Sequence, residues 1–250
     1  MLGVRVVKVG GAELDDAAWL GRFAAALATA RPAVVVHGGG RRISAWQERL
    51  GLRVEKVNGV RVTTADVADV AHMVLCGPTQ SDVVRSLRAS GVDAVGVAGA
   101  EGYFTVELVD AARLGRVGRV TRVDVEGLHR LLAAGFTPVI APPSVDERGE
   151  AVNVNADEAA ATVAHALGAA ELLFVSDVVG VLRDGRPLSS VSTGDIPQLV
   201  AQGVVTDGMV AKLEAAARSR VARVRIGDIH VLMDPDRGTL IVTEAVEAAA

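Results

Sequence analysis

Lys8 is the residue whose type and position point most directly to chemistry. It lies in a run of valines, residues 4 to 9, that only Arg5 otherwise interrupts, and Gly10-Gly11 follows at once. A lysine within a buried strand is costly unless its ammonium reaches an anion or water. Two interpretations follow: a point charge aimed at a phosphate group, or a lysine of a terminal strand that extends to the surface.

Two glycine turns follow predicted strands in the first forty residues. Gly10-Gly11 comes after the first strand, and Gly38-Gly39-Gly40 comes after Ala33 to His37. Without a β-carbon, glycine lets backbone N–H groups approach an anion closely, although any turn from strand to helix favours glycine. Neither turn contains GxxxxGK followed by Ser or Thr, or GxGxxG, which excludes the P-loop and the usual dinucleotide motif.

A third polar group stands where a short strand leads into an alanine-rich helix, at Asn153-Val154-Asn155-Ala156-Asp157. Asn155 is placed to cap the helix, and Asp157 falls in the first turn, where free N–H groups and the helix dipole favour a carboxylate. A well-capped helix accounts for Asn155 and Asp157. It gives no role to Asn153.

Two further cations are candidates on weaker grounds. Arg61 lies in a predicted hairpin, residues 52–63, whose turn is Asn58-Gly59. Its guanidinium would suit a carboxylate, but a surface arginine on a strand fits the pattern equally well. Lys212 lies inside a predicted helix, where a lysine usually faces solvent.

The elements expected around these residues alternate between strand and helix, which predicts an α/β fold: a three-layer αβα sandwich around a central, mainly parallel sheet. Both glycine turns would then lie at the carboxyl ends of parallel strands, where open α/β sheets bind ligands. Residues 99–121 read instead as antiparallel hairpins. The last strands are expected at 222–226, 229–233 and 238–242. No linker is visible, so lobes 1–150 and 151–250 are expected to share one continuous sheet.

Composition and charge exclude several classes of protein. The net charge of -4 gives no broad basic surface, so nucleic acid is not an expected partner. No apolar run approaches the roughly 18 residues that a membrane span needs. The single cysteine, Cys76, cannot form an internal disulfide, and the early first strand leaves no room for a signal peptide. The histidines lack metal-ligand spacing. A cytoplasmic protein is expected.

Six motifs follow one another in a fixed order. They are Val7-Lys8-Val9-Gly10-Gly11, Val36-His37-Gly38-Gly39-Gly40, Val57-Asn58-Gly59-Val60-Arg61-Val62-Thr63, Asn153-Val154-Asn155-Ala156-Asp157, Ser176-Asp177-Val178-Val179-Gly180-Val181-Leu182 and Thr206-Asp207-Gly208-Met209-Val210-Ala211-Lys212-Leu213. Their order and spacing resemble the amino acid kinase family, and most closely its acetylglutamate kinases, over residues 4 to 242. The six together are highly specific, although no single one is.

The resemblance implies ATP-dependent phosphorylation of the γ-carboxylate of N-acetyl-L-glutamate to N-acetyl-L-glutamyl 5-phosphate, the second step of arginine biosynthesis. It implies that Lys8 and Lys212 stabilise the transferring phosphoryl group and that Asp157 holds both lysines. A carboxylate nucleophile needs charge and alignment, not a general base. We expect both ammonium groups at about 3 Å from Asp157 in a closed nucleotide-bound form, and farther away in an open empty form.

The same resemblance implies two groups of binding residues. The substrate would contact Gly39, Gly40, Arg61, Asn153 and Asn155, with Arg61 on the α-carboxylate. The nucleotide would contact Gly10, Gly11, Asp177, Val178, Gly180, Leu182, Gly203 and Thr206. Mg²⁺ would be bound through the ATP phosphates, with no ligand from the protein. In this division residues 1–150 bind the acyl amino acid and form the dimer interface, and residues 151–250 bind ATP.

The sequence departs from the family at two places. Ala12 stands where serine is frequent after the glycines, and residues 77–82 lack a frequent Asn-Lys pair. Members inhibited by arginine carry an additional N-terminal helix that builds a hexamer. Because this chain enters its first strand within a few residues, the expectation is an arginine-insensitive homodimer.

Two alternatives stay open. One is a kinase of lysine biosynthesis whose α-aminoadipate or glutamate substrate is attached to a carrier protein. Such relatives usually differ around Arg61 and the Asn-x-Asn motif. The other is a nonenzymatic amino-acid or nucleotide sensor on the same fold. A pure binder has no need for the transition-state charges of Lys8 and Lys212.

Overall fold

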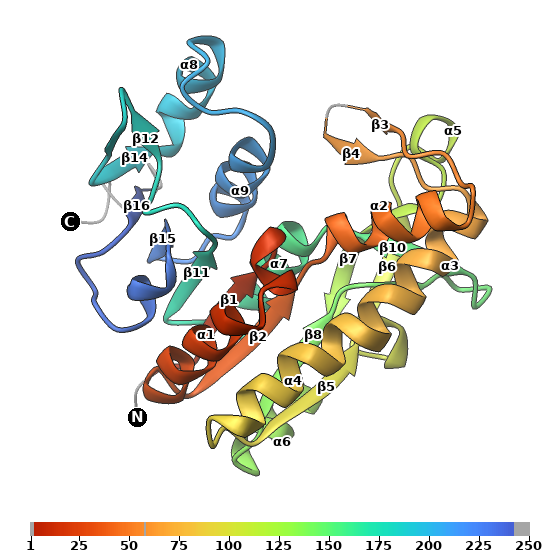
Figure 1. The fold of residues 1–250 in the computed structure, drawn as a ribbon, viewed down its shortest axis with the longest axis horizontal. Helices are drawn as coiled ribbons and strands as arrows, with labels where there is room; N and C mark the ends of the chain where they lie inside the picture. Colours follow the sequence, from red (N-terminus) through yellow and green to blue (C-terminus); the bar gives the residue numbers. More distant parts are fainter. Residues whose placement is uncertain (1–2, 58, 243–250) are drawn as a thin grey trace.

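The computed structural model describes residues 3–57 and 59–242, so Asn58 of the predicted hairpin turn lies outside the described residues. Its centre is an eight-stranded sheet (Figure 1). In spatial order the strands are β14 (Ser190–Ser192), β16 (Thr239–Val242), β15 (Val224–Gly227), β11 (Glu171–Val175), β1 (Arg5–Val9), β2 (Ala33–His37), β8 (Thr137–Ala141) and β5 (Ala94–Ala98). Only the β15–β16 pairing in this sheet is antiparallel, which confirms the predicted α/β fold with a mainly parallel sheet.

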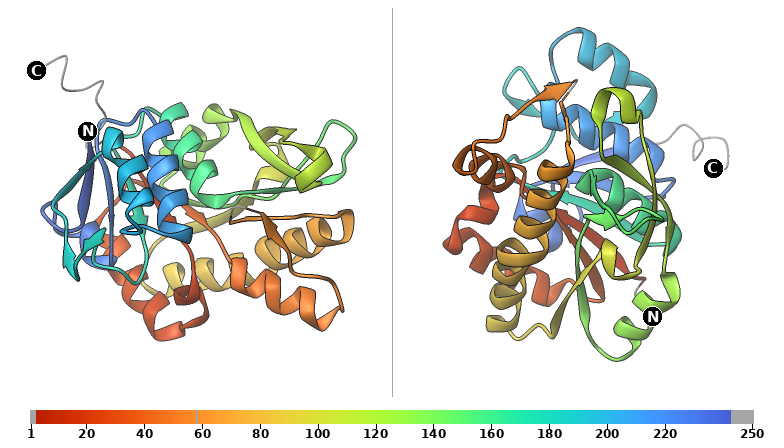
Figure 2. Two further views of the ribbon diagram at one scale, coloured as in Figure 1. Left: turned by 90° about the horizontal axis from the view of Figure 1, so that it is seen from above. Right: turned by 90° about the vertical axis from the view of Figure 1, so that its right-hand side faces the viewer.

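Two cores lie on opposite faces of this sheet, because side chains of a strand alternate between its faces. Val6 of β1 packs in one core, with α6 (Val125–Ala133), α7 (Ala156–Ala166) and α9 (Asp207–Arg218). Val7 packs in the other, with α1 (Ala17–Thr29) and α4 (Gln80–Ala89). Figure 2 shows helices on both sides of the sheet. The result is the expected three-layer sandwich.

The glycine turns follow β1 and β2, as predicted, and lie side by side because these strands are neighbours. After Gly10-Gly11 a short 3-10 helix, Ala12–Asp15, leads into α1, where Asp16 accepts from the N–H of Ala18 at 2.8 Å. The second turn opens α2 (Gly40–Arg49). The N–H of Gly38 donates to the carbonyl of Val9 at 2.8 Å, which ties the two turns together.

A second, smaller sheet carries the Asn-x-Asn motif. Its strands are β6 (Phe104–Leu108), β7 (Val117–Val123), β10 (Ala151–Val154) and β9 (Ser144–Val145). The antiparallel β6–β7 pair confirms the expected hairpin within 99–121. β10 runs directly into α7 and so carries Asn153 and Asp157 to the sheet end. The hairpin of β3 (Lys56–Val57) and β4 (Val60–Arg61) is followed by α3 (Ala65–Val74).

The C-terminal part holds the hairpin of β12 (Leu182–Arg183) and β13 (Arg186–Pro187), the helix α8 (Ile196–Ala201) and α9. The predicted strand 229–233 is wrong: Ile229–Leu232 is a 3-10 helix, capped by Asp228, which accepts from the N–H of His230 at 3.0 Å. Val231 and Leu232 of this helix are buried in the core that also contains α1.

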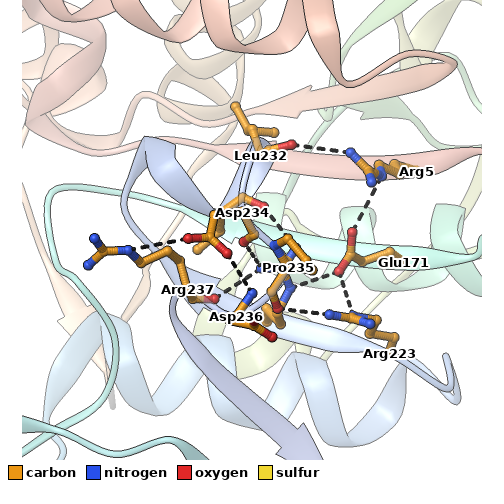
Figure 3. A network of polar contacts seen from close by, with 10 residues as sticks. Arg5, Glu171, Arg223, Leu232, Asp234, Pro235, Asp236 and Arg237 are labelled. Atoms are coloured by element: carbon orange, nitrogen blue, oxygen red, sulfur yellow. Dashed lines mark hydrogen bonds and ion pairs between the residues drawn. The ribbon is translucent and has the colours of Figure 1, made fainter.

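An ion-pair network ties the amino ends of β1, β11 and β15 (Figure 3). The buried carboxylate of Glu171 lies 2.8 Å from Nε of Arg225, 3.0 Å from Nε of Arg223 and 3.4 Å from Nε of Arg5. Arg225 also donates to three backbone carbonyls in the segment 231–237, at 2.8 to 3.0 Å. This segment is therefore held firmly against the sheet.

No helix within 3–57 and 59–242 joins the length to the apolar character that crossing a bilayer requires.

Candidate active site

A cavity of about 220 Å³ opens at the carboxyl ends of β1 and β2. Both glycine turns, the β3–β4 hairpin and the start of α7 contribute to its wall. Seven of the residues singled out in the sequence as catalytic or substrate-binding line it: Lys8, Gly39, Gly40, Arg61, Asn153, Asn155 and Asp157. Gly11, expected at the nucleotide, lines it too. The fold thus brings together residues that lie far apart in the chain.

Lys8 and Lys212 converge on Asp157. Lys8 is only 5% exposed, which excludes a lysine that extends to the surface. Its Nζ lies 2.9 Å from Oδ1 of Asp157, and Nζ of Lys212 lies 4.0 Å from the same oxygen. The ammonium of Lys8 is not aligned for a hydrogen bond, since this oxygen accepts none. Burial and then the charge of Lys8 lower the pKa of Lys212, and Asp157 opposes them.

The position of Asp157 follows from the capping of α7. The side chain of Asn155 accepts from the N–H of Asp157 at 2.8 Å and from that of Glu158 at 3.3 Å, which confirms the predicted N-cap. The first turn of α7 then points the Asp157 carboxylate at β1, and α7 also packs against α9, the helix that carries Lys212. One helix start therefore places the carboxylate between cations from two separate elements.

Arg61 is a buried guanidinium, 8% exposed. It donates to the carbonyl of Gly40 at 2.8 Å, to Oγ of Ser44 at 3.0 Å and to the side chain of Gln47. Among the described residues no carboxylate comes within ion-pair distance of it, and burial lowers its pKa. A buried cation that lines a cavity and has only neutral partners favours an anionic ligand there.

Asn153 is linked to Arg61 through one hydroxyl. Its Nδ2 donates to Oγ1 of Thr63 at 3.2 Å, and that hydroxyl donates to the carbonyl of Arg61 at 2.9 Å. This contact orients the carboxamide on the cavity wall. A capping role for Asn155 and an orienting contact for Asn153 together account for both asparagines of the motif.

The glycines of the two turns are fixed by close neighbours. A β-carbon on Gly39 would lie 2.6 Å from Cδ2 of Leu75, and one on Gly10 would lie 3.0 Å from Nζ of Lys8. Gly11 has φ of 113°, a conformation that favours glycine, and Oε2 of Glu13 fills the space of its missing side chain. Ordinary turn chemistry does not explain such crowding.

Unsatisfied polar atoms gather at these turns. Within the part of the chain that the structure describes, four buried side-chain atoms have no hydrogen-bond partner: Oε2 of Glu13, Nε2 of His37, Oγ1 of Thr79 and Oδ1 of Asp157. Glu13 follows the first turn, His37 precedes the second, and Thr79 packs under Gly39. Such atoms are costly, so their concentration marks a place where ligand groups complete the bonding.

His37 is fully buried, and burial lowers its pKa to about 4. Its Nδ1 lies 3.2 Å from the carbonyl of Gly38, a contact that requires a proton on Nδ1. In neutral solution the ring is therefore uncharged, and its Nε2 is an acceptor without a donor.

Apart from Gly10 and Gly11, the residues expected at the nucleotide lie outside this cavity, on the C-terminal part. Asp177 and Val178 follow β11, Leu182 begins β12, Gly203 follows the C-cap of α8 with φ of 68°, and Thr206 precedes α9. Asp177 and Thr206 are exposed, and Leu182 is 39% exposed. These three side chains are therefore open to solvent.

Gly180 has a packing reason of its own. A β-carbon there would lie 2.6 Å from Oγ1 of Thr239. That hydroxyl accepts from the N–H of Val181 at 2.8 Å and donates to the carbonyl of Leu188 at 2.7 Å. Glycine thus lets the loop after β11 close against β16.

Two charged residues at the site were missed in the sequence. Lys56 of β3 lines the cavity. Glu13 is 8% exposed, and its pKa is raised by burial and by the neighbouring carboxylate of Asp177, while Lys8 lowers it. Lys56 pairs with Arg61 across the predicted hairpin, so its position was available from the pattern. Nothing local distinguishes Glu13 from the acidic residues that precede α1.

Comparison with known proteins places this geometry in a family. The sequence profile of the amino acid kinase family matches residues 3–228. The acetylglutamate kinase of Chloroflexus aurantiacus is 46% identical over 241 residues, 92% of this chain and 95% of that protein. That of Geobacillus kaustophilus is 42% identical over 216 residues, 84% of this chain and 83% of that protein.

A solved structure is similar as well. The crystal structure of smu.665 from Streptococcus mutans UA159 has a TM-score of 0.83 and 28% sequence identity, and the match covers 96% of this chain and 98% of that one. The family profile and these relatives agree over most of the sequence. The chain belongs to the amino acid kinase family.

Proposed function

We propose that this protein is an acetylglutamate kinase, which transfers the γ-phosphoryl group of ATP to the γ-carboxylate of N-acetyl-L-glutamate in arginine biosynthesis. The observation that carries the proposal is the pair of ammonium groups, Lys8 buried and Lys212 partly buried, held by Asp157 beside a cavity that Arg61 also lines. Relatives named acetylglutamate kinase, at 41–46% identity, support this choice within the family.

The substrate would occupy the cavity of about 220 Å³, which is smaller than the roughly 300 Å³ at which pockets for drug-sized ligands begin. Its α-carboxylate would pair with Arg61, replacing some of the neutral partners of that guanidinium. Backbone N–H groups at Gly39 and Gly40 and the carboxamide of Asn153 would contact the rest of the molecule. The side-chain oxygen of Asn155 already caps α7, so only its amide group is available.

The phosphoryl group would pass between the two lysines. Lys8 comes from β1 and Lys212 from α9, so the ammonium groups approach from different elements and stabilise charge as it spreads over the phosphoryl oxygens. Asp157 keeps these like charges together before ATP arrives. The attacking carboxylate is already ionised in neutral solution, so no residue has to remove a proton.

Mg²⁺ is included in this proposal as the partner of the nucleotide. When bound, the ion neutralises charge on the β- and γ-phosphates. The oxygen ligands that it prefers are available at the site in Glu13 and Asp177. The remaining parts of the proposal are a cytoplasmic location and the division of labour between residues 1–150 and 151–250.

A homodimer built through the N-terminal part is also proposed. Large apolar side chains of this part are partly exposed, including Leu50 at 53% and Met73 at 46%, on or next to α2 and α3. A second copy would cover them. Sedimentation at several protein concentrations tests this point, and a monomer at all of them contradicts it.

A hydroxamate assay for acyl phosphate tests the function. The protein is incubated with ATP, Mg²⁺ and, in parallel, N-acetylglutamate, N-acetylaspartate, aspartate, glutamate or a carrier-linked α-aminoadipate or glutamate. Turnover with N-acetylglutamate is expected. Turnover only with a carrier-linked acid would favour the lysine pathway, and binding without turnover of any acid would favour a sensor.

A further inference from the structure

Glu13 is a buried carboxylate, and one of its oxygens has no hydrogen-bond donor among the described residues. It lies in the 3-10 helix after Gly11, is 8% exposed, and its Oε2 fills the space beside the α-carbon of Gly11. That oxygen accepts no hydrogen bond, and within 3–57 and 59–242 no cation pairs with Glu13 at 4.0 Å or less. A buried carboxylate without a donor or a cation destabilises the folded protein when no ligand is bound.

The charges around Glu13 do not relieve this condition. Burial raises the pKa of Glu13, and the carboxylate of Asp177, two residues after β11, raises it further, so two carboxylates lie together. Lys8 and Lys212 are near enough to interact electrostatically, but both are engaged with Asp157 at 2.9 and 4.0 Å. Glu13 and Asp177 therefore form a locally negative pair beside Gly11 before any phosphate arrives.

A bound nucleotide adds further negative charge next to Glu13 and Asp177 unless it brings a cation. Phosphates that approach Gly10-Gly11 come next to the Glu13 carboxylate and would be repelled by it. Mg²⁺ binds oxygen ligands and is typically held by one or two carboxylates together with substrate phosphates. In the described part of the chain no cluster of three or more His, Cys, Asp or Glu side chains could hold a metal. A site of two carboxylates would thus need the phosphates to be complete.

We propose that Glu13, together with Asp177, binds the Mg²⁺ ion of the nucleotide, directly or through its water ligands. This inference rests on the proposed function and changes one expectation, that the ion is bound through the phosphates alone. It gives the carboxylate against Gly11 a ligand of the right charge. Glu13 would then favour binding of the nucleotide with its metal over binding of the metal-free nucleotide.

The experiment measures Mn²⁺ as a probe for the metal, by the electron paramagnetic resonance signal of the free ion. The full chain is titrated with Mn²⁺ in the presence of a non-hydrolysable ATP analogue. Removing a group that supports a metal ligand set typically costs 10- to 100-fold in affinity, so Glu13→Gln is expected to weaken Mn²⁺ binding by about tenfold or more. Glu126→Gln, on the surface of α6, removes the same charge elsewhere and should change nothing.

A second titration separates metal binding from support of the loop. The analogue is added without metal, in the presence of a chelator, and its affinity is measured by calorimetry. Glu13→Gln should bind the metal-free analogue as well as the unaltered protein does, or more tightly, because a repelling charge is gone. Equal Mn²⁺ affinity in the two proteins, or an equal loss with and without metal, would overturn the proposal.

A further variant keeps the test decisive if Glu13→Gln does not fold, as judged by its thermal midpoint. Asp177→Asn changes an exposed residue and should weaken Mn²⁺ binding in the same direction, and an unchanged affinity would count against the proposal. Neither titration contains N-acetylglutamate. A wrong substrate assignment would therefore leave these results intact, and a failed metal site would leave the hydroxamate assay intact.

Discussion

The two ends of β1 each hold a cation beside a buried carboxylate, but the bonding differs. At the amino end three arginines surround Glu171, and Arg225 also donates hydrogen bonds to three backbone carbonyls. At the carboxyl end two lysines share one oxygen of Asp157, and that oxygen accepts no hydrogen bond. One cluster has used its bonding capacity within the protein, and the other has not.

This difference separates a structural cluster from a site that can act on a ligand. An arginine fork forms several directed bonds at once and suits a fixed network, whereas a lysine is a mobile point charge. The four unsatisfied buried atoms of the described residues all lie around the carboxyl end. Unused donors and acceptors, more than charge itself, therefore identify the working end of the sheet.

The largest expected effect comes from substitutions of the two lysines at the carboxyl end of β1. Lys8→Arg or Lys212→Ala should lower kcat by about 10²–10³-fold, because the first displaces and the second removes a charged donor that acts mainly in the transition state. Affinity for ATP should fall far less. Steady-state kinetics and calorimetry measure both quantities, and turnover close to that of the unaltered protein in either variant would defeat the assignment.

A change at the amino end should affect stability instead. Arg225→Leu leaves the buried carboxylate of Glu171 without its main partner, so the free energy of unfolding should fall by about 3–5 kcal/mol. Arg5→Ala should cost only about 0–1 kcal/mol, since the Arg5 side chain is 35% exposed. Urea unfolding measures both. The folded fraction of Arg225→Leu should keep a kcat close to that of the unaltered protein. A large fall in the kcat of this folded fraction would contradict the comparison.

His37 should make the carboxyl end sensitive to acid. Burial lowers its pKa from 6.5 to about 4, so the unfolded chain binds a proton in this window that the folded protein does not. Stability should therefore be complete above pH 6.5 and fall as the pH drops towards 4, by about 3 kcal/mol for this one group. In His37→Asn the loss between pH 6.5 and 4 should be smaller, as followed by thermal unfolding at several pH values.

The smallest effect concerns Glu13 in the protein without ligand. Its raised pKa means that the folded state holds a proton more tightly than the unfolded chain, so this group lowers stability as the pH rises above 4.5. Glu13→Gln should therefore raise the thermal midpoint at neutral pH. The gain should shrink in acid, and a gain that does not depend on pH would point to packing instead.

The sequence was sufficient where a pattern is local. The strand–glycine turns, the cap at Asn155 and the mainly parallel sheet follow from spacing and residue type. It was insufficient where burial depends on distant segments. Ile229–Leu232 forms a 3-10 helix that packs against α1, and the carboxylate that acts on Glu13 is Asp177, which follows β11 far along the chain. For Lys8 the sequence left two interpretations, and only the packing of β1 between β2 and β11 decided between them.

The two distances to Asp157 also describe a mechanical asymmetry. Lys8 sits on a strand paired on both sides and anchored at its far end by the arginine network, and it is already 2.9 Å from the carboxylate. Lys212 lies on α9, which packs against α7 and α8, and its ammonium is 4.0 Å from the carboxylate. Lys8 is therefore held in place by the sheet, and Lys212 is the ammonium group that is farther from Asp157. We therefore expect closure on the phosphoryl group to bring the amino end of α9 towards β1, and substitutions in the adjoining turn at 203–206 to change kcat by altering that approach.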